Sequence, residues 1–106
     1  KPEAVRRRAR RLAKRVQELG VRAEVAPGRS TVGGGSLPGE TLPTYLVALS
    51  IPSANALARR LRLGEPPVVG RIEGDRFLLD LRTVLPPQEP DLWRALQAAL
   101  APDLKV

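Results

Sequence analysis

A two-residue turn at Gly74-Asp75 constrains the fold of this chain more than any other feature. The segments 68–73 and 76–83 are apolar on alternate positions and flank a dipeptide that is typical of tight β-hairpin turns. If Glu73 lies opposite Arg76, the pairing of the whole hairpin is fixed, and the charges on one face attract each other. The apolar side chains then share the other face: Val68, Ile72, Phe77, Leu79 and Leu81. Because one register satisfies both faces, the sequence predicts an antiparallel hairpin here.

Three segments show the apolar spacing of amphipathic helices. The first carries one apolar stripe between Val5 and Leu19, and Gly20 is suited to end it. The second is predicted to begin after Ser53, a good N-cap residue, and to stop at Gly64. The third spans residues 89–100. The first stripe is rich in alanine, which predicts close packing against a sheet or another helix.

Two further strands are predicted before the hairpin. Residues 21–26 alternate between apolar and polar side chains, and residues 44–51 are apolar and rich in β-formers. The stretch 27–43 between them holds five glycines and three prolines, so it is not expected to be regular throughout. The predicted class is α+β: a small three- to four-stranded antiparallel or mixed sheet with helices packed on one face.

The composition fits one globular domain taken from a longer protein. The 106 residues are 42% hydrophobic and contain no Met, even at position 1. We therefore expect a helix at residues 1–20 that leads in from a larger domain, followed by a small domain at residues 21–106. A signal-peptide core and an apolar run of about 20 residues are both missing, which favours a cytoplasmic protein with no membrane partner.

The absence of Cys and His excludes several kinds of chemistry from this chain. Zinc held by thiolate or imidazole, a histidine base and a cysteine nucleophile are all ruled out. The three lysines, Lys1, Lys14 and Lys105, lie near the ends and outside apolar settings that would suit Schiff-base chemistry. The prediction is that the chain holds no catalytic, cofactor-binding or metal-binding residues of its own.

The positive charge is confined to the first segment. The formal net charge is +7, and residues 1–15 account for all of it, because residues 16–106 hold equal numbers of basic and acidic side chains. Arg7, Arg11 and Arg15 follow each other at intervals of four, so they are candidate contacts for the phosphates of a nucleic acid. The alternative is a solvated helix face whose arginines cover apolar surface or pair with acids of another domain.

The glycine-rich run Gly33, Gly34, Gly35 and Ser36 is the second candidate site. Glycines let a backbone approach a ligand or another chain closely, and the serine adds a hydroxyl group. The run is not a P-loop, because no Gly-Lys-Ser/Thr follows it. A flexible connection between strands is the alternative.

Two stretches of the chain resemble one known family. Residues 32–44 (VGGGSLPGETLPT) and residues 66–84 (PPVVGRIEGDRFLLDLRTV) are similar to motifs of the bacterial selenocysteine synthases, the L-seryl-tRNA(Sec) selenium transferases. The basic helix at residues 3–19 also resembles the helix that enters the last domain of that family. The one departure is Gly74-Asp75, where many relatives have the two residues in the opposite order.

The resemblance implies a C-terminal small domain of a fold-type I enzyme that depends on pyridoxal 5′-phosphate. Such an enzyme converts seryl-tRNA(Sec) to selenocysteinyl-tRNA(Sec) with selenophosphate, in the cytoplasm, as a ring-shaped homo-oligomer. Its cofactor is bound through a lysine of the large domain, outside this chain. The loop from Gly33 to Ser36 would then face the active-site cleft, and the chain alone would be inactive.

Two rival functions remain open at this point. The first is a stand-alone basic module that binds nucleic acid, against which the neutral residues 16–106 and the scarcity of aromatic residues argue. The second is the small domain of a related pyridoxal-phosphate enzyme that acts on free amino or sugar acids.

Overall fold

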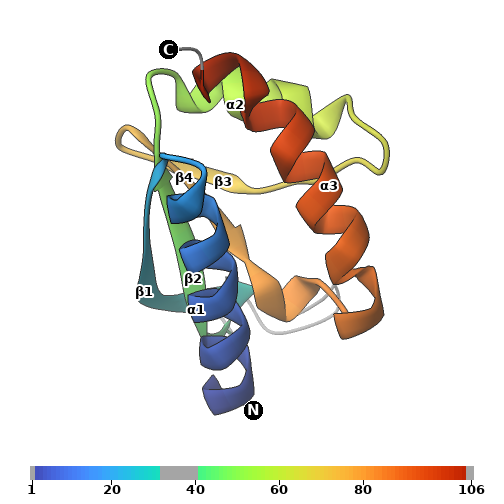
Figure 1. Cartoon of the computed structure of the whole chain (residues 1–106). Coiled ribbons are helices and arrows are strands. Elements are labelled where there is room, and N and C mark those ends of the chain that lie inside the picture. Colours follow the sequence, from blue (N-terminus) through green and yellow to red (C-terminus); the bar gives the residue numbers. More distant parts are fainter. Residues whose placement is uncertain (1, 32–40, 105–106) are drawn as a thin grey trace.

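The structure is a computed structural model that describes residues 2–31 and 41–104 (Figure 1). These residues form three α-helices, four strands and three short 3₁₀ turns. The elements in chain order are α1 (Pro2–Glu18), β1 (Arg22–Thr31), β2 (Thr41–Ser50), α2 (Ala54–Arg62), β3 (Arg71–Glu73), β4 (Arg76–Asp80), η1 (Leu81–Thr83), η2 (Pro86–Gln88), α3 (Glu89–Leu100) and η3 (Ala101–Leu104).

The strands form one antiparallel sheet in the order β1-β2-β4-β3, which confirms the predicted α+β class. The hairpin register is also confirmed, because Glu73 pairs with Arg76 and Ile72 with Phe77. Gly74 has a φ of 61°, a backbone conformation that glycine adopts without strain.

The hairpin is shorter than the pattern predicts, since β3 begins at Arg71 and β4 ends at Asp80. The apolar residues beyond these points are still buried, but other contacts hold them. The backbone N–H of Val68 donates to the carbonyl of Leu61 in α2 at 2.9 Å, and Leu81 is buried in the turn η1. Ile72 lies on the predicted face and is 39% exposed, because β3 is an edge strand.

Gly70 is the point where the chain passes closest to the ring of Phe77. A Cβ atom at this position would contact that ring and would lie 2.6 Å from the carbonyl oxygen of Leu78. The space around Gly70 is therefore too small for any side chain, which accounts for a glycine beside the largest fully buried residue of the core.

Strand β1 continues to Thr31, five residues beyond the predicted end. It passes through Pro27 and Gly28, which the sequence pattern places in an irregular segment. A proline is tolerated here because β1 lies at the edge of the sheet. Gly28 leaves room for Leu46 of the neighbouring strand, whose Cδ1 atom would lie 2.5 Å from an added Cβ.

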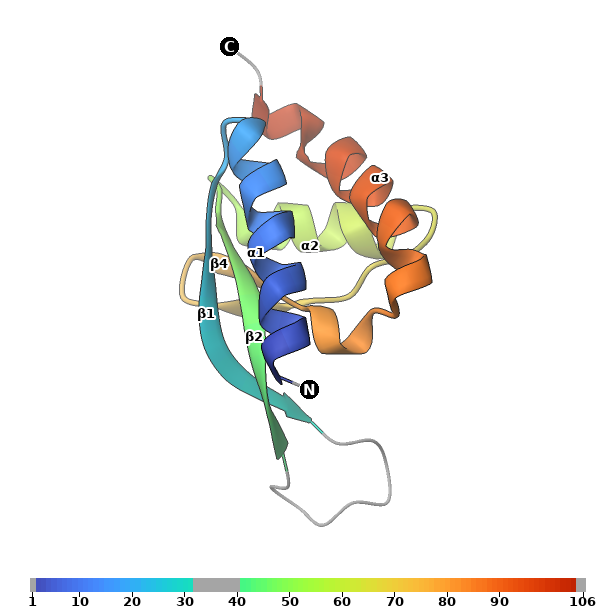
Figure 2. The same ribbon diagram turned by 60° about the horizontal axis from the view of Figure 1, so that its bottom comes forward.

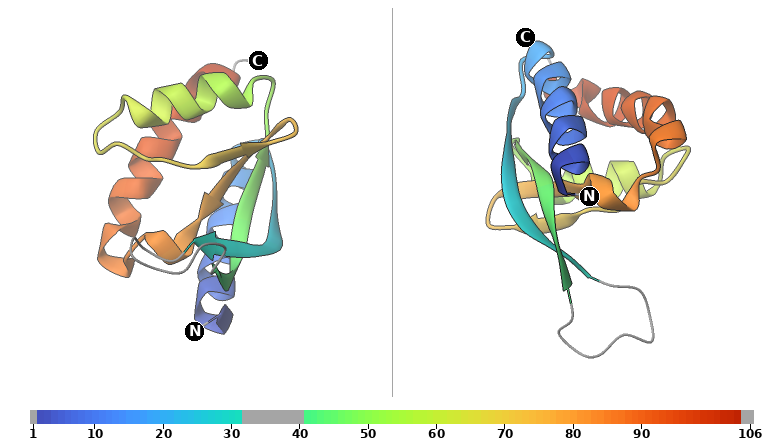
Figure 3. Two further views of the ribbon diagram at one scale, coloured as in Figure 1. Left: turned by 180° about the vertical axis from the view of Figure 1, so that it is seen from behind. Right: turned by 90° about the horizontal axis from the view of Figure 1, so that it is seen from below.

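The helices pack on one face of the sheet and enclose the main core (Figures 2 and 3). The stripe of α1 is buried as predicted, and Ser53 caps α2 by accepting from the N–H of Ala56 at 3.1 Å. The core also includes Leu57 and Leu61 of α2 and residues of α3. Residues of α1 belong to the same core as the rest of the chain. The predicted division into a leading helix at residues 1–20 and a small domain at residues 21–106 stays a prediction. None of the helices in the described ranges is long and apolar enough to cross a membrane.

The opposite face of the sheet carries a second, smaller cluster that the sequence pattern did not reveal. Leu46, Ala48 and Leu78 are buried there without a helix above them. On the same face, Arg76 forms an ion pair with Glu24 at 2.7 Å, which joins β4 to β1 across β2. The long side chains on this face shield the small cluster from water.

Candidate functional site

The cations of α1 divide into those that contact the rest of the domain and those that face solvent. Four of them are exposed and lie outside the buried stripe of the helix: Arg7, Arg10, Arg11 and Lys14. Arg10 and Lys14 also border a groove that Glu24 and Val25 of β1 line from the other side. We call these four residues the outer ridge. Within residues 2–31 and 41–104, none of the four forms an ion pair or a side-chain hydrogen bond. Their charges are therefore available to a partner.

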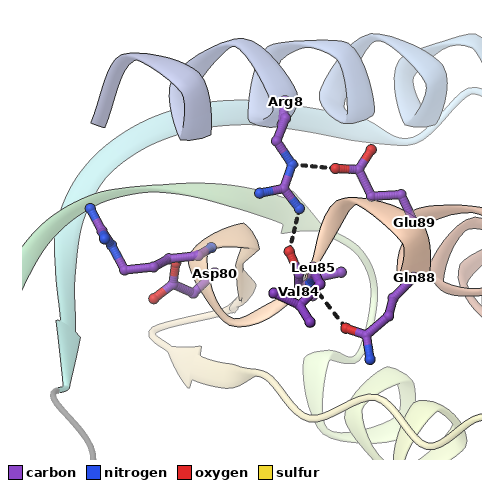
Figure 4. Close-up of polar contacts among 7 residues, drawn as sticks. Arg8, Asp80, Val84, Leu85, Gln88 and Glu89 are labelled. Carbon is purple, nitrogen blue, oxygen red and sulfur yellow. Dashed lines mark hydrogen bonds and ion pairs between the residues drawn. The ribbon is translucent and has the colours of Figure 1, made fainter. Parts of the chain in front are cut away.

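Arg8 lies on the flank of α1 that faces α3, and it is fully engaged (Figure 4). Its Nε atom donates to the carboxylate of Glu89, and its Nη2 atom donates to the carbonyl of Val84. The Arg8 side chain is only 16% exposed. Glu89 is the first residue of α3, where a negative charge also favours the helix dipole. This arginine therefore joins α1 to the start of α3.

Arg15 lies on the same flank, and its guanidinium group is 4.5 Å from the ring centroid of Trp93. This distance is within the range of cation–π attraction. Beside the pair is a cavity of about 20 Å³, lined by Arg11 and Leu92 among others, which has room for about one water molecule. Trp93 is half-buried and packs against the main core. The pair closes the junction between the helices and leaves no room for a nucleotide base.

Arg6 occupies the flank over β2. Its guanidinium group is 5.5 Å from the ring centroid of Tyr45, and its Nη1 atom is 3.6 Å from a carboxylate oxygen of Glu3. Two of the three aromatic rings of the chain are thus covered by arginines, and the third, Phe77, is buried in the core as predicted. These rings offer no platform on which bases could stack.

The structure therefore separates the three predicted phosphate contacts. Arg7 and Arg11 belong to the outer ridge, whereas Arg15 turns toward α3. Arg10 and Lys14 extend the ridge in their place. The role of Arg7, Arg11 and Arg15 in tRNA binding stays a prediction. The second predicted site, Gly33, Gly34, Gly35 and Ser36, lies outside the described residues.

A polar network fastens the end of β4 to β2. The Oδ1 atom of Asp80 accepts from the hydroxyl of Thr44 at 2.8 Å and from the backbone N–H of Arg82 at 3.0 Å. The Nη2 atom of Arg82 donates to the carbonyl of Pro43 at 2.8 Å. Thr44 is only 2% exposed, so Asp80 supplies a partner that this buried hydroxyl requires. Asp80 therefore has a structural role.

One of the larger grooves of the described surface lies beside α3. The groove between residues 66–69 and the start of α3 has a volume of about 380 Å³, and its walls are mainly apolar. Its polar residues have local partners: Thr83 donates to the carbonyl of Asp80, and Gln88 accepts from the N–H of Leu85 (Figure 4). In residues 2–31 and 41–104, no three His, Cys, Asp or Glu side chains are grouped so that they could hold a metal ion.

These features define a small α+β domain whose polar residues serve mainly its own architecture, with one unpaired basic ridge. A family model described as L-seryl-tRNA selenium transferase matches residues 1–85. The L-seryl-tRNA(Sec) selenium transferase of Aquifex aeolicus is 41% identical over 102 residues, which cover 93% of this chain and 23% of the relative. The protein of the same name from Nitratidesulfovibrio vulgaris is 45% identical over 104 residues, which cover 93% of this chain and 22% of the relative.

The chain belongs to the L-seryl-tRNA selenium transferase family, as its two motifs indicate. It spans less than a quarter of the length of these curated relatives. The aligned shares give the length of the matched segment and not its position, so a C-terminal position stays a prediction from the motifs.

Proposed function

We propose that the chain is the small domain of an enzyme that converts seryl-tRNA(Sec) to selenocysteinyl-tRNA(Sec) with selenophosphate. The observation that carries this proposal is the family match over residues 1–85, together with relatives of that name at 41% and 45% identity. The small size of the chain beside these relatives accounts for the lack of a complete catalytic centre in the described residues. The two motifs favour a C-terminal position in the longer enzyme.

The domain acts by completing the active-site cleft and by packing on the large domain. The described polar groups support this passive role, because Arg8, Asp80 and Arg82 are committed to internal contacts. The full enzyme works in the cytoplasm as a ring of identical subunits.

The cofactor of the full enzyme is pyridoxal 5′-phosphate, which supplies the electron sink for replacing the seryl oxygen by selenium. The described residues of this chain do not fit the cofactor. Lys14 is exposed on α1 beside Arg10, Gln17 and Glu24, in a wet and charged setting rather than the apolar setting that favours a neutral amine. The proposal therefore assigns the cofactor lysine to the large domain.

The test is the visible absorption spectrum of the full-length enzyme, measured before and after treatment with borohydride. A visible band that borohydride removes is expected for a lysine-bound pyridoxal cofactor. A colourless protein that cannot be reconstituted with the cofactor would overturn the proposal. If the band is present but only free amino or sugar acids are substrates, the chain is the small domain of a related enzyme instead.

A further inference from the structure

We propose that the outer ridge of α1 (Arg7, Arg10, Arg11 and Lys14) binds the phosphate backbone of the tRNA on which the enzyme acts. The inference rests on the proposed function, and it assigns a binding surface to the described residues of this chain. Arg15, which the sequence grouped with Arg7 and Arg11, is left out of this surface because its guanidinium group lies over Trp93. Arg10 and Lys14 are included instead.

The geometry of the ridge suits a run of phosphates. Arg7, Arg11 and Lys14 follow each other at intervals of four and three residues, or about 6 and 4.5 Å along the helix axis. Such residues lie on one side of a helix. All of them are exposed and unpaired in the described structure, so no internal contact must break before they bind.

The chemistry of the ridge favours backbone contacts over base reading. Its members are all cations, and the rings of Tyr45 and Trp93 that flank α1 are each already covered by an arginine, Arg6 and Arg15. Contacts to phosphates position a nucleic acid without reading its sequence. The ridge is therefore expected to hold and orient the tRNA rather than to select it.

Neighbouring charges limit the extent of the ridge. Glu18 lies one turn beyond Lys14 on the same side of the helix, and it ends the run of positive charge. The contacts are thus confined to the part of α1 between Arg7 and Lys14. The N-terminal end of α1 lies toward the end of the molecule where β1 ends at Thr31 and β2 begins at Thr41 (Figure 2).

An RNA partner explains the ridge better than a structural role within this domain. Like charges at intervals of four residues destabilise a helix by about 0.2–0.5 kcal/mol for each pair. Arg7 and Arg11 form such a pair, as do Arg10 and Lys14, and none of these four side chains forms an ion pair within the described residues. A polyanion neutralises all four charges together.

The test compares two triple variants of the full-length enzyme that lose the same number of charges. The ridge variant is Arg7→Gln, Arg11→Gln, Lys14→Gln. The control is Arg59→Gln, Arg62→Gln, Arg71→Gln, at exposed positions on α2 and β3. Binding of a fluorescein-labelled tRNA(Sec) transcript is measured by anisotropy at several NaCl concentrations.

The ridge variant is expected to bind at least tenfold more weakly at 0.1 M NaCl, and the control is expected to bind within twofold of the wild type. Each lost phosphate contact reduces the slope of log K against log[NaCl] by about 0.7–0.9, so the slope should fall by about 2 in the ridge variant. Unchanged affinity and slope in the ridge variant would overturn the inference.

A charge-preserving variant separates binding from folding. Arg7→Lys, Arg11→Lys keeps both charges and should restore most of the affinity, since a phosphate contact needs a cation rather than a particular shape. In turnover assays the ridge variant should raise KM for seryl-tRNA(Sec) while kcat changes by less than twofold.

The outcomes separate the inference from the proposed function. If the enzyme transfers selenium normally and the ridge variant keeps the wild-type KM, only the inference fails. If the enzyme lacks pyridoxal phosphate and selenium transfer, the proposed function fails, whatever the ridge binds. If the ridge variant instead melts earlier in the full-length enzyme and binds tRNA normally, the ridge contacts another domain, and the inference is wrong.

Discussion

The inner and outer sides of α1 carry the same kinds of charge and use them differently. On the flank toward α3, Arg8 and Arg15 hold the helix against Glu89 and Trp93. On the outer side, Arg7 and Arg11 have the same side chain and form no ion pair or side-chain hydrogen bond in the described structure. The difference shows that net charge alone does not identify a binding surface. The contacts made on folding decide which of these charges stay available to a partner.

Three pairs of adjacent residues on α1 test this comparison, because each pair consists of one inner and one outer residue. The largest effect is expected at Leu12, which is 8% exposed in the main core. Leu12→Ala should lower the free energy of unfolding by about 2–4 kcal/mol through lost burial and a residual cavity. Arg11→Ala, one residue away, should change it by less than about 0.5 kcal/mol. Urea unfolding of this chain measures both, and equal losses would contradict the division.

A smaller effect is expected at Arg8, which holds two partners in a half-buried setting. Arg8→Gln should cost about 1–3 kcal/mol, because it leaves Glu89 and the carbonyl of Val84 without their charged donor. Arg7→Gln is the matched control and should be nearly neutral. A double-mutant cycle of Arg8→Gln with Glu89→Gln should show coupling of about 0.5 kcal/mol or more. Additive losses would show that the pair does not join the helices.

The smallest effect is expected at Arg15. Arg15→Gln removes the cation above Trp93 and should cost about 0.5–1 kcal/mol. It should also change the fluorescence of Trp93, which is the only tryptophan. Lys14→Gln should leave both quantities unchanged, whereas Arg15→Lys should keep part of the stability. An unaltered spectrum in Arg15→Gln would mean that the two side chains are apart in solution.

The elements that sequence predicts well are those fixed by local chemistry. The two-residue turn at Gly74 and Asp75 fixes the register of the hairpin. Ser53 marks the start of α2 by capping it, and Gly20 follows the end of α1 with a positive φ. The extension of β1 through Pro27 could not be read from the pattern, since a proline is acceptable only because β1 is an edge strand. The burial of Leu78 on the open face depends in the same way on neighbours that are distant in sequence.

The candidate site was only partly predictable for the same reason. The basic character of α1 is local, and the sequence identifies it directly. Which arginines are engaged depends on Glu89 and Trp93, both more than 70 residues from their partners on α1. The pairing of Arg76 with Glu24 rather than with Glu73, its partner in the hairpin, also required the sheet order. Sequence spacing carries no information about these contacts, so it grouped Arg15 with Arg7 and Arg11.

The most direct test of the account is a selenium-transfer assay on the full-length enzyme and on the 106-residue chain in parallel. Each is given seryl-tRNA(Sec) and selenophosphate, with pyridoxal phosphate present, and selenocysteinyl-tRNA is measured. The account predicts product from the full-length enzyme and none from the chain alone. Turnover by the chain alone, or a pyridoxal-loaded full-length enzyme that leaves seryl-tRNA(Sec) unchanged, would contradict it.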